Sequence, residues 1–422
     1  MFLANGNIKT LGLKIHLPVI QRELLAPDQD YTFRQMTQTC CKPHLASSMF
    51  LTKPLCFILS TAIFYTAGLT IANNDPRIYF HGRWDSSPGS WWPGTGFKLH
   101  VQNLTALSLN LDTYTSSPAS IGVSIDYQNF TSVDVYAGTN DIPLGNPSPN
   151  GSVVRINAWG WQNNQMLLQN LVLNSDAILL PYQPANVNFL FIGDSLSAGQ
   201  YLPMGIDQAW PFIVGEHFKA EHTVIAQPGI TLADVQSWYN THGMSVQFFD
   251  TEDSNYATTS NHNYTTLWDF SRDKPTPTHI VIHIGANDVS HVSASQFVQI
   301  YLAFIKRLRQ YYPDQPIFVF TPWGWPQPDG SVSYYYVGSY QQIVSMRYRR
   351  SSRNLTPPIL IHDSQDPNVH LVDTSGWVAY ADIFPDNSHP NVAGHQKIAG
   401  EFTNWLANNF NLSPASQWAT SV

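Results

Sequence analysis

Residues 189–200 read Phe189-Leu-Phe-Ile-Gly-Asp-Ser-Leu-Ser-Ala-Gly-Gln200, an apolar run that ends in a glycine, an aspartate and a serine. Four consecutive apolar residues are typical of a strand buried inside a parallel sheet. Gly193 permits a sharp turn after this strand, so Ser195 is expected at the carboxyl edge of the sheet, where α/β proteins bind ligands. Ser195 is therefore the candidate nucleophile. A serine at the start of a helix also serves as a simple cap, and this segment alone leaves that alternative open.

A second segment supplies the base that a serine nucleophile requires. Residues 385–390 read Pro385-Asp-Asn-Ser-His-Pro390 and precede a helical pattern that runs from Val392 to about Phe410. His389 is the candidate base, and Asp386 is the candidate partner that orients its ring.

Two further segments offer donors for an oxyanion. The strand pattern of residues 279–284 continues into Gly285-Ala-Asn-Asp288, which places the amide of Asn287 at the end of another strand. Residues 226–230 form a Pro-Gly turn in which Gly229, without a side chain, exposes its backbone N–H. Asn287 and Gly229 are therefore the candidate oxyanion donors.

In this order the four segments resemble the GDSL or SGNH hydrolase superfamily, whose sequence blocks carry a serine, a glycine, an asparagine and a histidine. The matching positions are Ser195, Gly229, Asn287 and His389, and Asp386 completes the Asp-x-x-His form of the last block. The resemblance implies that the serine attacks an ester and that the histidine acts as base. It also implies an oxyanion hole made of the serine N–H, the glycine N–H and the asparagine amide, with no metal or organic cofactor.

The same resemblance implies a flavodoxin-like three-layer α/β/α domain, expected over residues 187–412. Local patterns agree with it, because strand and helix signals alternate as in a parallel sheet. Strands are expected at residues 189–192, 280–284, 317–320 and 359–361. One apolar stripe at helical spacing consists of Phe297, Ile300, Tyr301, Phe304 and Leu308.

Residues 75–183 have a different sequence pattern, with short segments in which apolar and polar residues alternate. This alternation predicts half-buried antiparallel strands at residues 97–101, 107–111, 121–125 and 132–136. We therefore expect a small all-β jelly-roll or sandwich domain, separated from the next domain by residues 181–187.

This arrangement resembles the two-domain carbohydrate esterases of family two. The supporting stretches are Arg77-Ile-Tyr-Phe-His-Gly-Arg83 and Trp91-Trp-Pro-Gly-Thr-Gly-Phe97, and the resemblance covers about residues 77–410. It implies removal of acetyl groups from plant polysaccharides such as acetylated xylan or glucomannan. Two alternatives stay open, namely a lipid or phospholipid acylhydrolase with the same catalytic residues and a noncatalytic glycan-binding protein.

Two tryptophans follow the expected strand at residues 317–320. Trp323 and Trp325 lie in Thr321-Pro-Trp-Gly-Trp-Pro326, where their indoles either stack on a sugar ring at the edge of the sheet or pack in the core. We name both as candidate substrate-binding residues and leave the packing alternative open.

The composition limits the classes of partner. Charged residues make up 12% and aromatic residues 13% of the chain, a balance that suits an extracellular enzyme acting on sugars, although core packing uses most such rings. The formal net charge is −8 and no basic cluster occurs, which argues against nucleic acid.

The amino-terminal region contains an export signal that starts at Met49. Lys53 is followed by an apolar core from Leu55 and by small residues near Ala72, so residues 49–72 are expected to be a signal peptide cleaved near Ala72. Residues 1–48 then form an unstructured upstream extension. The alternative is a cytoplasmic tail before an uncleaved anchor. With cleavage, the protein is secreted and has no stable membrane association.

The cysteines and the glycosylation sequons fit export. Cys40, Cys41 and Cys56 all precede the expected cleavage point, which leaves no cysteine for a disulfide or a metal site in the mature chain. Six sequons follow it, at Asn103, Asn129, Asn150, Asn263, Asn354 and Asn411.

Overall fold

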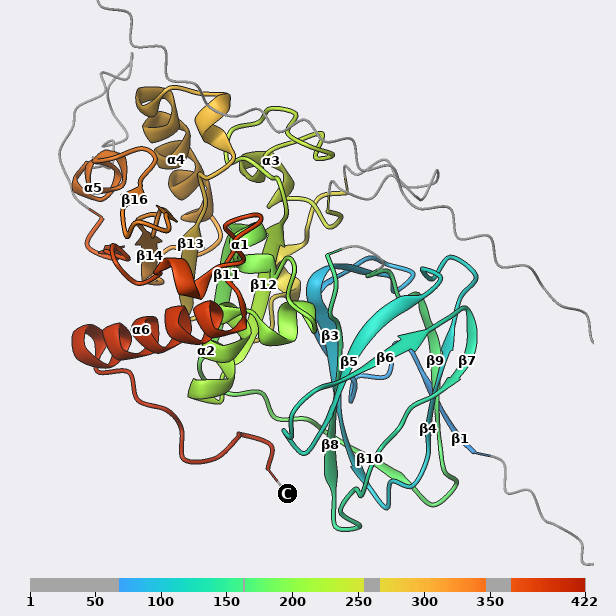
Figure 1. Cartoon of the computed structure of the whole chain (residues 1–422). Helices are drawn as coiled ribbons and strands as arrows, with labels where there is room; N and C mark the ends of the chain where they lie inside the picture. Colours follow the sequence, from blue (N-terminus) through green and yellow to red (C-terminus); the bar gives the residue numbers. More distant parts are fainter. Residues whose placement is uncertain (1–67, 162–163, 254–265, 347–365, 422) are drawn as a thin grey trace, which may run out of the picture. The chain divides into compact units, whose positions relative to one another are not determined.

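A computed structural model of the chain describes residues 68–161, 164–253, 266–346 and 366–421. These described residues belong to one compact unit. Within it, an all-β part comes first along the chain, and an α/β part that contains the candidate site follows (Figure 1).

Within the described residues, the α/β part contains a five-stranded parallel sheet. Its strands, in spatial order, are β12 (Glu221–Gln227), β11 (Asn188–Asp194), β13 (His279–His283), β14 (Ile317–Phe320) and β17 (Val369–Val372). Counted along the chain this is the order 2-1-3-4-5 of flavodoxin-like folds, so the expected fold is confirmed. The order reverses at β11, which places the residues after β11 at the point where such folds bind ligands.

Helices cover both faces of this sheet. The cluster on one face contains α2 (Trp210–Phe218) and α6 (Val392–Phe410), and the cluster on the other contains α3 (Met244–Gln247), α4 (Ala294–Leu308) and α5 (Ser339–Ser345). Phe189 and Phe191 pack in the α2 and α6 cluster, whereas Leu190 and Ile192 pack in the α4 cluster. Burial on both faces explains the continuous apolar run of β11. The strand expected at residues 359–361 lies outside the described residues.

Helix α4 follows the stripe expected from its sequence. Phe297, Tyr301, Phe304 and Leu308 are buried against the sheet, and Ile300 lies partly buried at the edge of the stripe. Ser293 caps the first turn in a capping box with Gln296, which explains why the helix begins here. Short 3₁₀-helices cover Gly205–Gln208, Phe270–Arg272, Asp288–Ser290 and Tyr380–Asp382.

The all-β part consists of two antiparallel sheets around a shared apolar core. The first sheet has the order β1 (Leu69–Ala72), β9 (Leu168–Leu173), β4 (Leu107–Leu111) and β7 (Gly138–Asp141). The second has the order β10 (Ile178–Leu180), β3 (Ser90–Gln102), β8 (Ser152–Ala158), β5 (Ala119–Ile125) and β6 (Thr131–Val135), with β2 (Tyr79–Trp84) paired to β3. This is the sandwich expected from the alternating segments.

Strand β1 lies within the expected signal peptide. Its four residues pair with β9, and Ile71 is buried in the core of the sandwich. Cleavage near Ala72 would remove this strand, whereas cleavage before Leu69 would keep the sheet intact. The rest of the expected signal peptide, up to residue 67, and the expected extension over residues 1–48 lie outside the described residues.

Buried ion pairs join the two parts of the compact unit. Lys98 on β3 and Glu221 on β12 lie 2.5 Å apart, and their side chains are only 5% and 2% exposed. Glu221 also accepts a hydrogen bond from the Tyr182 hydroxyl at 3.0 Å. Arg155 on β8 pairs with Glu216 on α2 at 2.6 Å. Charges as deeply buried as those of Lys98 and Glu221 are tolerated only when they are paired, so this pair favours the observed docking of the sandwich on the α/β part; Glu216 is 30% exposed.

Candidate active site

Ser195 starts a short helix at the end of the first parallel strand. Helix α1 spans Ser195–Ala198, and the Asp194 carboxylate caps it by accepting a hydrogen bond from the N–H of Leu196 at 3.0 Å. Gly193 is required by close packing, because a Cβ there would meet the Ser197 side chain and come within 2.9 Å of the His283 carbonyl. The N–H of Ser195 belongs to the first turn of α1, where no intrahelical acceptor exists.

His389 lies beside this serine. The ring Nε2 of His389 is 2.9 Å from Oγ of Ser195, and its Nδ1 is 3.0 Å from the carbonyl oxygen of Asn387. A carbonyl only accepts, so Nδ1 carries the proton and Nε2 is free to accept the proton of the serine hydroxyl. Burial lowers the pKa of His389 below 6.5, although the contact with Asn387 opposes that shift. The ring is therefore neutral and aimed as a base at neutral pH.

The expectation that Asp386 orients His389 is wrong in this structure. The group on Nδ1 is the backbone carbonyl of Asn387, and the exposed Asp386 makes no hydrogen bond to the ring. The local backbone gives the reason. Ser388 adopts a left-handed conformation with φ of 60°, and the N–H of Phe384 bonds the carbonyl of His389 at 2.8 Å. This turn places the carbonyl oxygen of Asn387 against Nδ1 of the His389 ring.

Gly229 and Asn287 are brought together as expected. The N–H of Ile230 bonds the carbonyl of Gln227 at 3.2 Å, and Gly229 has φ of 77°, so Gly229 occupies the turn position that requires a positive φ. The side-chain amide of Asn287 donates to the carbonyl of Ile230 at 3.0 Å, directly after this turn. Gly229 N–H donates to no other residue in the described part of the chain.

Two buried carboxylates fix the loops that carry these groups. Asp288 accepts hydrogen bonds from the N–H groups of Leu232 and Ala233 at 2.8 and 2.9 Å, which ties the loop after Gly229 to the loop of Asn287. Burial raises the pKa of Asp194 to about 7 and that of Asp288 to about 6. Both carboxylates hold backbone in place, which gives them a positioning role rather than a place among the proton-transfer groups.

The two candidate substrate-binding tryptophans have different surroundings. Trp323 is 1% exposed, and its indole stacks on the buried ring of His283 with centroids 3.9 Å apart. Its predicted role in substrate binding is wrong, because the chain after β14 turns this indole into the core. Trp325 lies in a two-stranded hairpin of β15 (Trp325–Pro326) and β16 (Val332–Ser333) and is half-buried near Tyr335. For Trp325 the role in binding stays a prediction.

Sequence reasoning missed three exposed aromatic residues near the site. Tyr201 is 53% exposed and contacts the ring of His389 with centroids 5.0 Å apart. Trp238 and Tyr239 are 76% and 79% exposed, and Trp238 lies so close to Gly229 that a Cβ there would be 2.6 Å from the indole. Their positions just after the serine block and the glycine block were the signal that could have revealed them.

Two other histidines near the strand ends are structural. Nδ1 of His395 accepts a hydrogen bond from the N–H of Trp210 at 3.1 Å. His283 has no hydrogen-bond partner on either ring nitrogen among the described residues, and its contacts are aromatic. Burial lowers the pKa of both rings to about 3, so both stay neutral and neither contributes a charge to the site.

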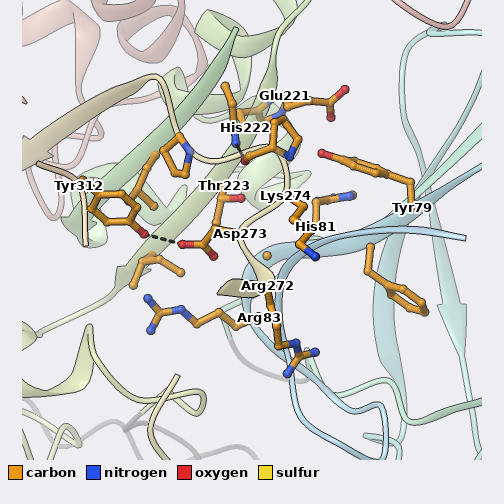
Figure 2. Close-up of a pocket in the computed structure, with 17 residues that line it drawn as sticks. Tyr79, His81, Arg83, Glu221, His222, Thr223, Arg272, Asp273, Lys274 and Tyr312 are labelled. Atoms are coloured by element: carbon orange, nitrogen blue, oxygen red, sulfur yellow. Dashed lines mark hydrogen bonds between the residues drawn. The ribbon is translucent and has the colours of Figure 1, made fainter. Parts of the chain in front are cut away.

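Figure 2 shows a cavity at a different edge of the sheet. Tyr79 and Arg83 of β2 line it together with Asn188 and residues 221–223, which lie at the starts of β11 and β12. Ser195 lies at the opposite, carboxyl edge. The cavity has a volume of about 30 Å³, which is room for roughly two water molecules. It therefore lies at the junction between the two parts of the protein, away from Ser195.

In the described ranges, no three His, Cys, Asp or Glu side chains lie closely enough together to hold a metal ion. No helix among the described residues has the length and apolar character needed to cross a membrane.

Solved structures with a similar fold include several carbohydrate esterases. A family two carbohydrate esterase from Cellvibrio japonicus has a TM-score of 0.62 at 19% identity, covering 82% of this chain and 99% of that one. A family two carbohydrate esterase from Clostridium thermocellum, solved with cellohexaose, has a TM-score of 0.58 at 20% identity, covering 79% and 99%. An acetyl xylan esterase from the rumen bacterium Butyrivibrio proteoclasticus has a TM-score of 0.58 at 15% identity, covering 80% and 97%.

Comparison at the level of sequence identifies the catalytic part. No curated protein matches the chain. Residues 191–397 match the model of the GDSL-like Lipase/Acylhydrolase family, and this match spans all four blocks from Ser195 to His389. Residues 191–397 are therefore similar to the GDSL-like Lipase/Acylhydrolase family, and they follow a β-sandwich in a fold similar to that of the family two carbohydrate esterases.

Proposed function

We propose that this protein is a secreted serine esterase that removes acetyl groups from plant cell-wall polysaccharides of the acetyl xylan or glucomannan type. The observation that carries the proposal is the 2.9 Å contact between Oγ of Ser195 and Nε2 of His389 at the carboxyl edge of the sheet. A serine that only capped a helix would not need a neutral imidazole aimed at its hydroxyl.

In the first half of the reaction, His389 takes the proton of the Ser195 hydroxyl as Oγ attacks the carbonyl carbon of the acetyl ester. The oxyanion that forms accepts hydrogen bonds from the N–H groups of Ser195 and Gly229 and from the Asn287 amide. The intermediate then breaks the bond to the sugar oxygen, which leaves with the proton held by His389. An acetyl group stays on Ser195.

In the second half, water replaces the sugar. His389 removes a proton from the water as it attacks the acetyl-serine, and the same donors stabilise the second oxyanion. Collapse of this intermediate releases acetic acid and returns the proton to Oγ of Ser195. The imidazolium is formed twice in each cycle, and the Asn387 carbonyl accepts from its Nδ1–H each time.

The choice of a sugar substrate is supported by exposed aromatic rings around these residues. Trp238 and Tyr239 lie at the turn beside Gly229 and offer flat faces to solvent, and such faces stack on pyranose rings. We therefore assign sugar stacking to these two residues instead of the buried Trp323, and Trp325 stays a candidate. The solved relatives described as carbohydrate esterases, one of them with cellohexaose bound, point to the same class of substrate.

A lipid acylhydrolase remains the second candidate. The family matched by residues 191–397 includes lipases, and Val289, two residues after Asn287, is 50% exposed. A noncatalytic glycan-binding protein is a weaker candidate, because it gives no reason for the contact between Ser195 and His389.

Secretion rests on the sequence of residues 49–72 and on the sequons. Four of the six sequon asparagines, Asn103, Asn129, Asn150 and Asn411, are exposed, as a glycan requires. Asn263 and Asn354 lie outside the described residues. Expression of the full coding sequence in a eukaryotic secretory host, followed by amino-terminal sequencing of the medium protein, tests this proposal. A new terminus at or before Leu69 is expected, and retention in cells would contradict it.

The esterase proposal is tested by measuring acetate released from acetylated xylan and acetylated glucomannan, with a long-chain lipid ester as the third substrate. Wild type is compared with Ser195→Ala and with Ser197→Ala. Ser197 is a matched control because it lies in the same helix and its hydroxyl has no partner among the described residues.

Acetate release by wild type and Ser197→Ala, but not by Ser195→Ala, supports the proposal. Cleavage of the lipid ester alone moves the assignment to the acylhydrolases. Binding of xylan without release of acid would instead favour the glycan-binding protein.

A further inference from the structure

Tyr201 has a backbone conformation that a tyrosine rarely adopts. It occupies the third position of a turn in which the N–H of Leu202 bonds the carbonyl of Gly199 at 3.1 Å. Its φ is 70°, in the left-handed region where a bulky side chain is strained. Turns of this kind favour glycine at the third position. The protein therefore keeps a tyrosine where glycine would be easier to accommodate.

Packing does not explain why this residue is a tyrosine. The side chain is 53% exposed, so its burial contributes much less than that of a core aromatic. Its hydroxyl makes no hydrogen bond to another described residue. Among the described residues, the one ring contact of Tyr201 is with His389, at a centroid distance of 5.0 Å and an angle of 80°.

The imidazole of His389 lacks a restraint that this ring can supply. Its two hydrogen bonds run from Nδ1 to the Asn387 carbonyl and between Nε2 and Oγ of Ser195. Both act on the nitrogen atoms of the ring, so packing against the rest of the ring limits small changes in χ1 and χ2. Tyr201 packs nearly perpendicular to the imidazole, and no carboxylate among the described residues is hydrogen-bonded to the ring.

We infer that Tyr201 is a positioning residue that holds the imidazole of His389 in line with Ser195, so that the protein works without a carboxylate on the base. This rests on the proposed function, in which His389 acts as the base. Backbone strain retained beside a reacting group is typical of residues kept for function rather than for stability.

The inference is tested with variants that separate the ring from the strain. Tyr201→Gly removes the ring and relieves the backbone, whereas Tyr201→Phe keeps the ring. Tyr201→Leu keeps the bulk without an aromatic face. Lys219→Gly is the matched control, because Lys219 also has a left-handed φ of 52°, at the end of α2.

Three quantities are measured on the full chain: kcat and KM for p-nitrophenyl acetate, the rate at which a fluorophosphonate probe labels Ser195, and Tm. For Tyr201→Gly we expect kcat and the labelling rate to fall about 10- to 100-fold with KM and Tm nearly unchanged, because slight misplacement of a catalytic group costs about this much. Tyr201→Phe restores the wild-type rates, and Tyr201→Leu does not. Lys219→Gly leaves both rates unchanged.

A second readout reports on the imidazole itself. Because burial lowers the pKa of His389, uncovering the ring in Tyr201→Gly raises that pKa toward 6.5, and the acid limb of kcat/KM moves to higher pH.

Unchanged rates and an unchanged acid limb in Tyr201→Gly would overturn the inference. A fall in kcat of Tyr201→Gly that parallels a fall in its Tm would also overturn the inference, because the ring would then stabilise the fold rather than position His389. If wild type neither hydrolyses the ester nor reacts with the probe, the proposed function is wrong. The inference about Tyr201, which depends on it, is then wrong as well.

Discussion

Replacement of Asp386 by asparagine tests how the base is oriented. In the structure Nδ1 of His389 donates to the Asn387 carbonyl at 3.0 Å, and Asp386 is exposed. Two effects govern the pKa of His389, namely burial, which lowers it, and the backbone contact with Asn387, which opposes that. The carboxylate of Asp386 therefore acts on the ring only at a distance and through solvent.

The size of the effect follows from this geometry. In a triad whose carboxylate bonds the histidine, the change to asparagine lowers kcat by about 10⁴. An exposed charge that only interacts through solvent is worth no more than about 1 kcal/mol, which is roughly a 5-fold change in rate. We therefore expect Asp386→Asn to lower kcat/KM on p-nitrophenyl acetate by less than about 5-fold, whereas His389→Ala abolishes turnover. A loss of 10³-fold or more at unchanged Tm would refute the carbonyl-oriented base.

The pH dependence gives an independent check of the same prediction. The base must be neutral, so activity is lost as the pH falls through the pKa of His389. Because burial lowers that pKa, the acid limb of kcat/KM should have its midpoint below pH 6.5. Asp386→Asn should leave the midpoint where it is. A midpoint above 6.5 that moves down in this variant would indicate a carboxylate on the ring.

Three further variants test other parts of the structure. Gly229→Ala places a Cβ within 2.6 Å of Trp238 at a φ of 77°, so the backbone N–H of residue 229 is displaced. Loss of this oxyanion donor should lower kcat by about 10²–10³. An unaltered kcat would show that this N–H does not stabilise the oxyanion. His283→Phe removes two unpaired ring nitrogens. The native pKa of His283 is about 3, so between that value and pH 6.5 the ring takes up a proton only in the unfolded state, which destabilises the wild type. In urea unfolding, the variant should therefore gain about 2 kcal/mol more stability over wild type at pH 5 than at pH 7. An equal gain at both pH values would mean that the ring is solvated. Lys98→Met leaves Glu221 buried without its partner and should cost about 3–5 kcal/mol, most of which the double variant with Glu221→Gln should recover; equal stability of the single and double variants would contradict the pairing.

The parts of the site that the sequence predicted are those carried by strand ends. Ser195 and Asn287 each follow an apolar strand, and Gly229 lies in a Pro-Gly turn after β12. Parallel strands bring their carboxyl ends to one edge whatever their spacing along the chain. His389 was found because a helix pattern follows it closely. The stripe on α4 was predictable from helical periodicity, whereas the flavodoxin-like order of the sheet was implied by the family resemblance.

The missed features depend on backbone detail that a residue pattern does not contain. The Asp-x-x-His spacing suggested Asp386, but the left-handed Ser388 brings the Asn387 carbonyl onto the ring instead. Trp323 occurs in a loop at a strand end, yet the direction of that loop buries it. The contact of Tyr201 with His389 joins residues far apart in the chain, so only the folded structure reveals it.

The central claim, that Ser195 carries the acyl group, can be tested by trapping the intermediate. The enzyme is mixed with an acetylated xylo-oligosaccharide, quenched in acid during the first turnover and analysed by peptide mass mapping. We expect one added acetyl group on the peptide that contains Ser195 and none in Ser195→Ala. Acetate released at the normal rate with no acetyl on that serine, or an acetyl group on another residue, would contradict it.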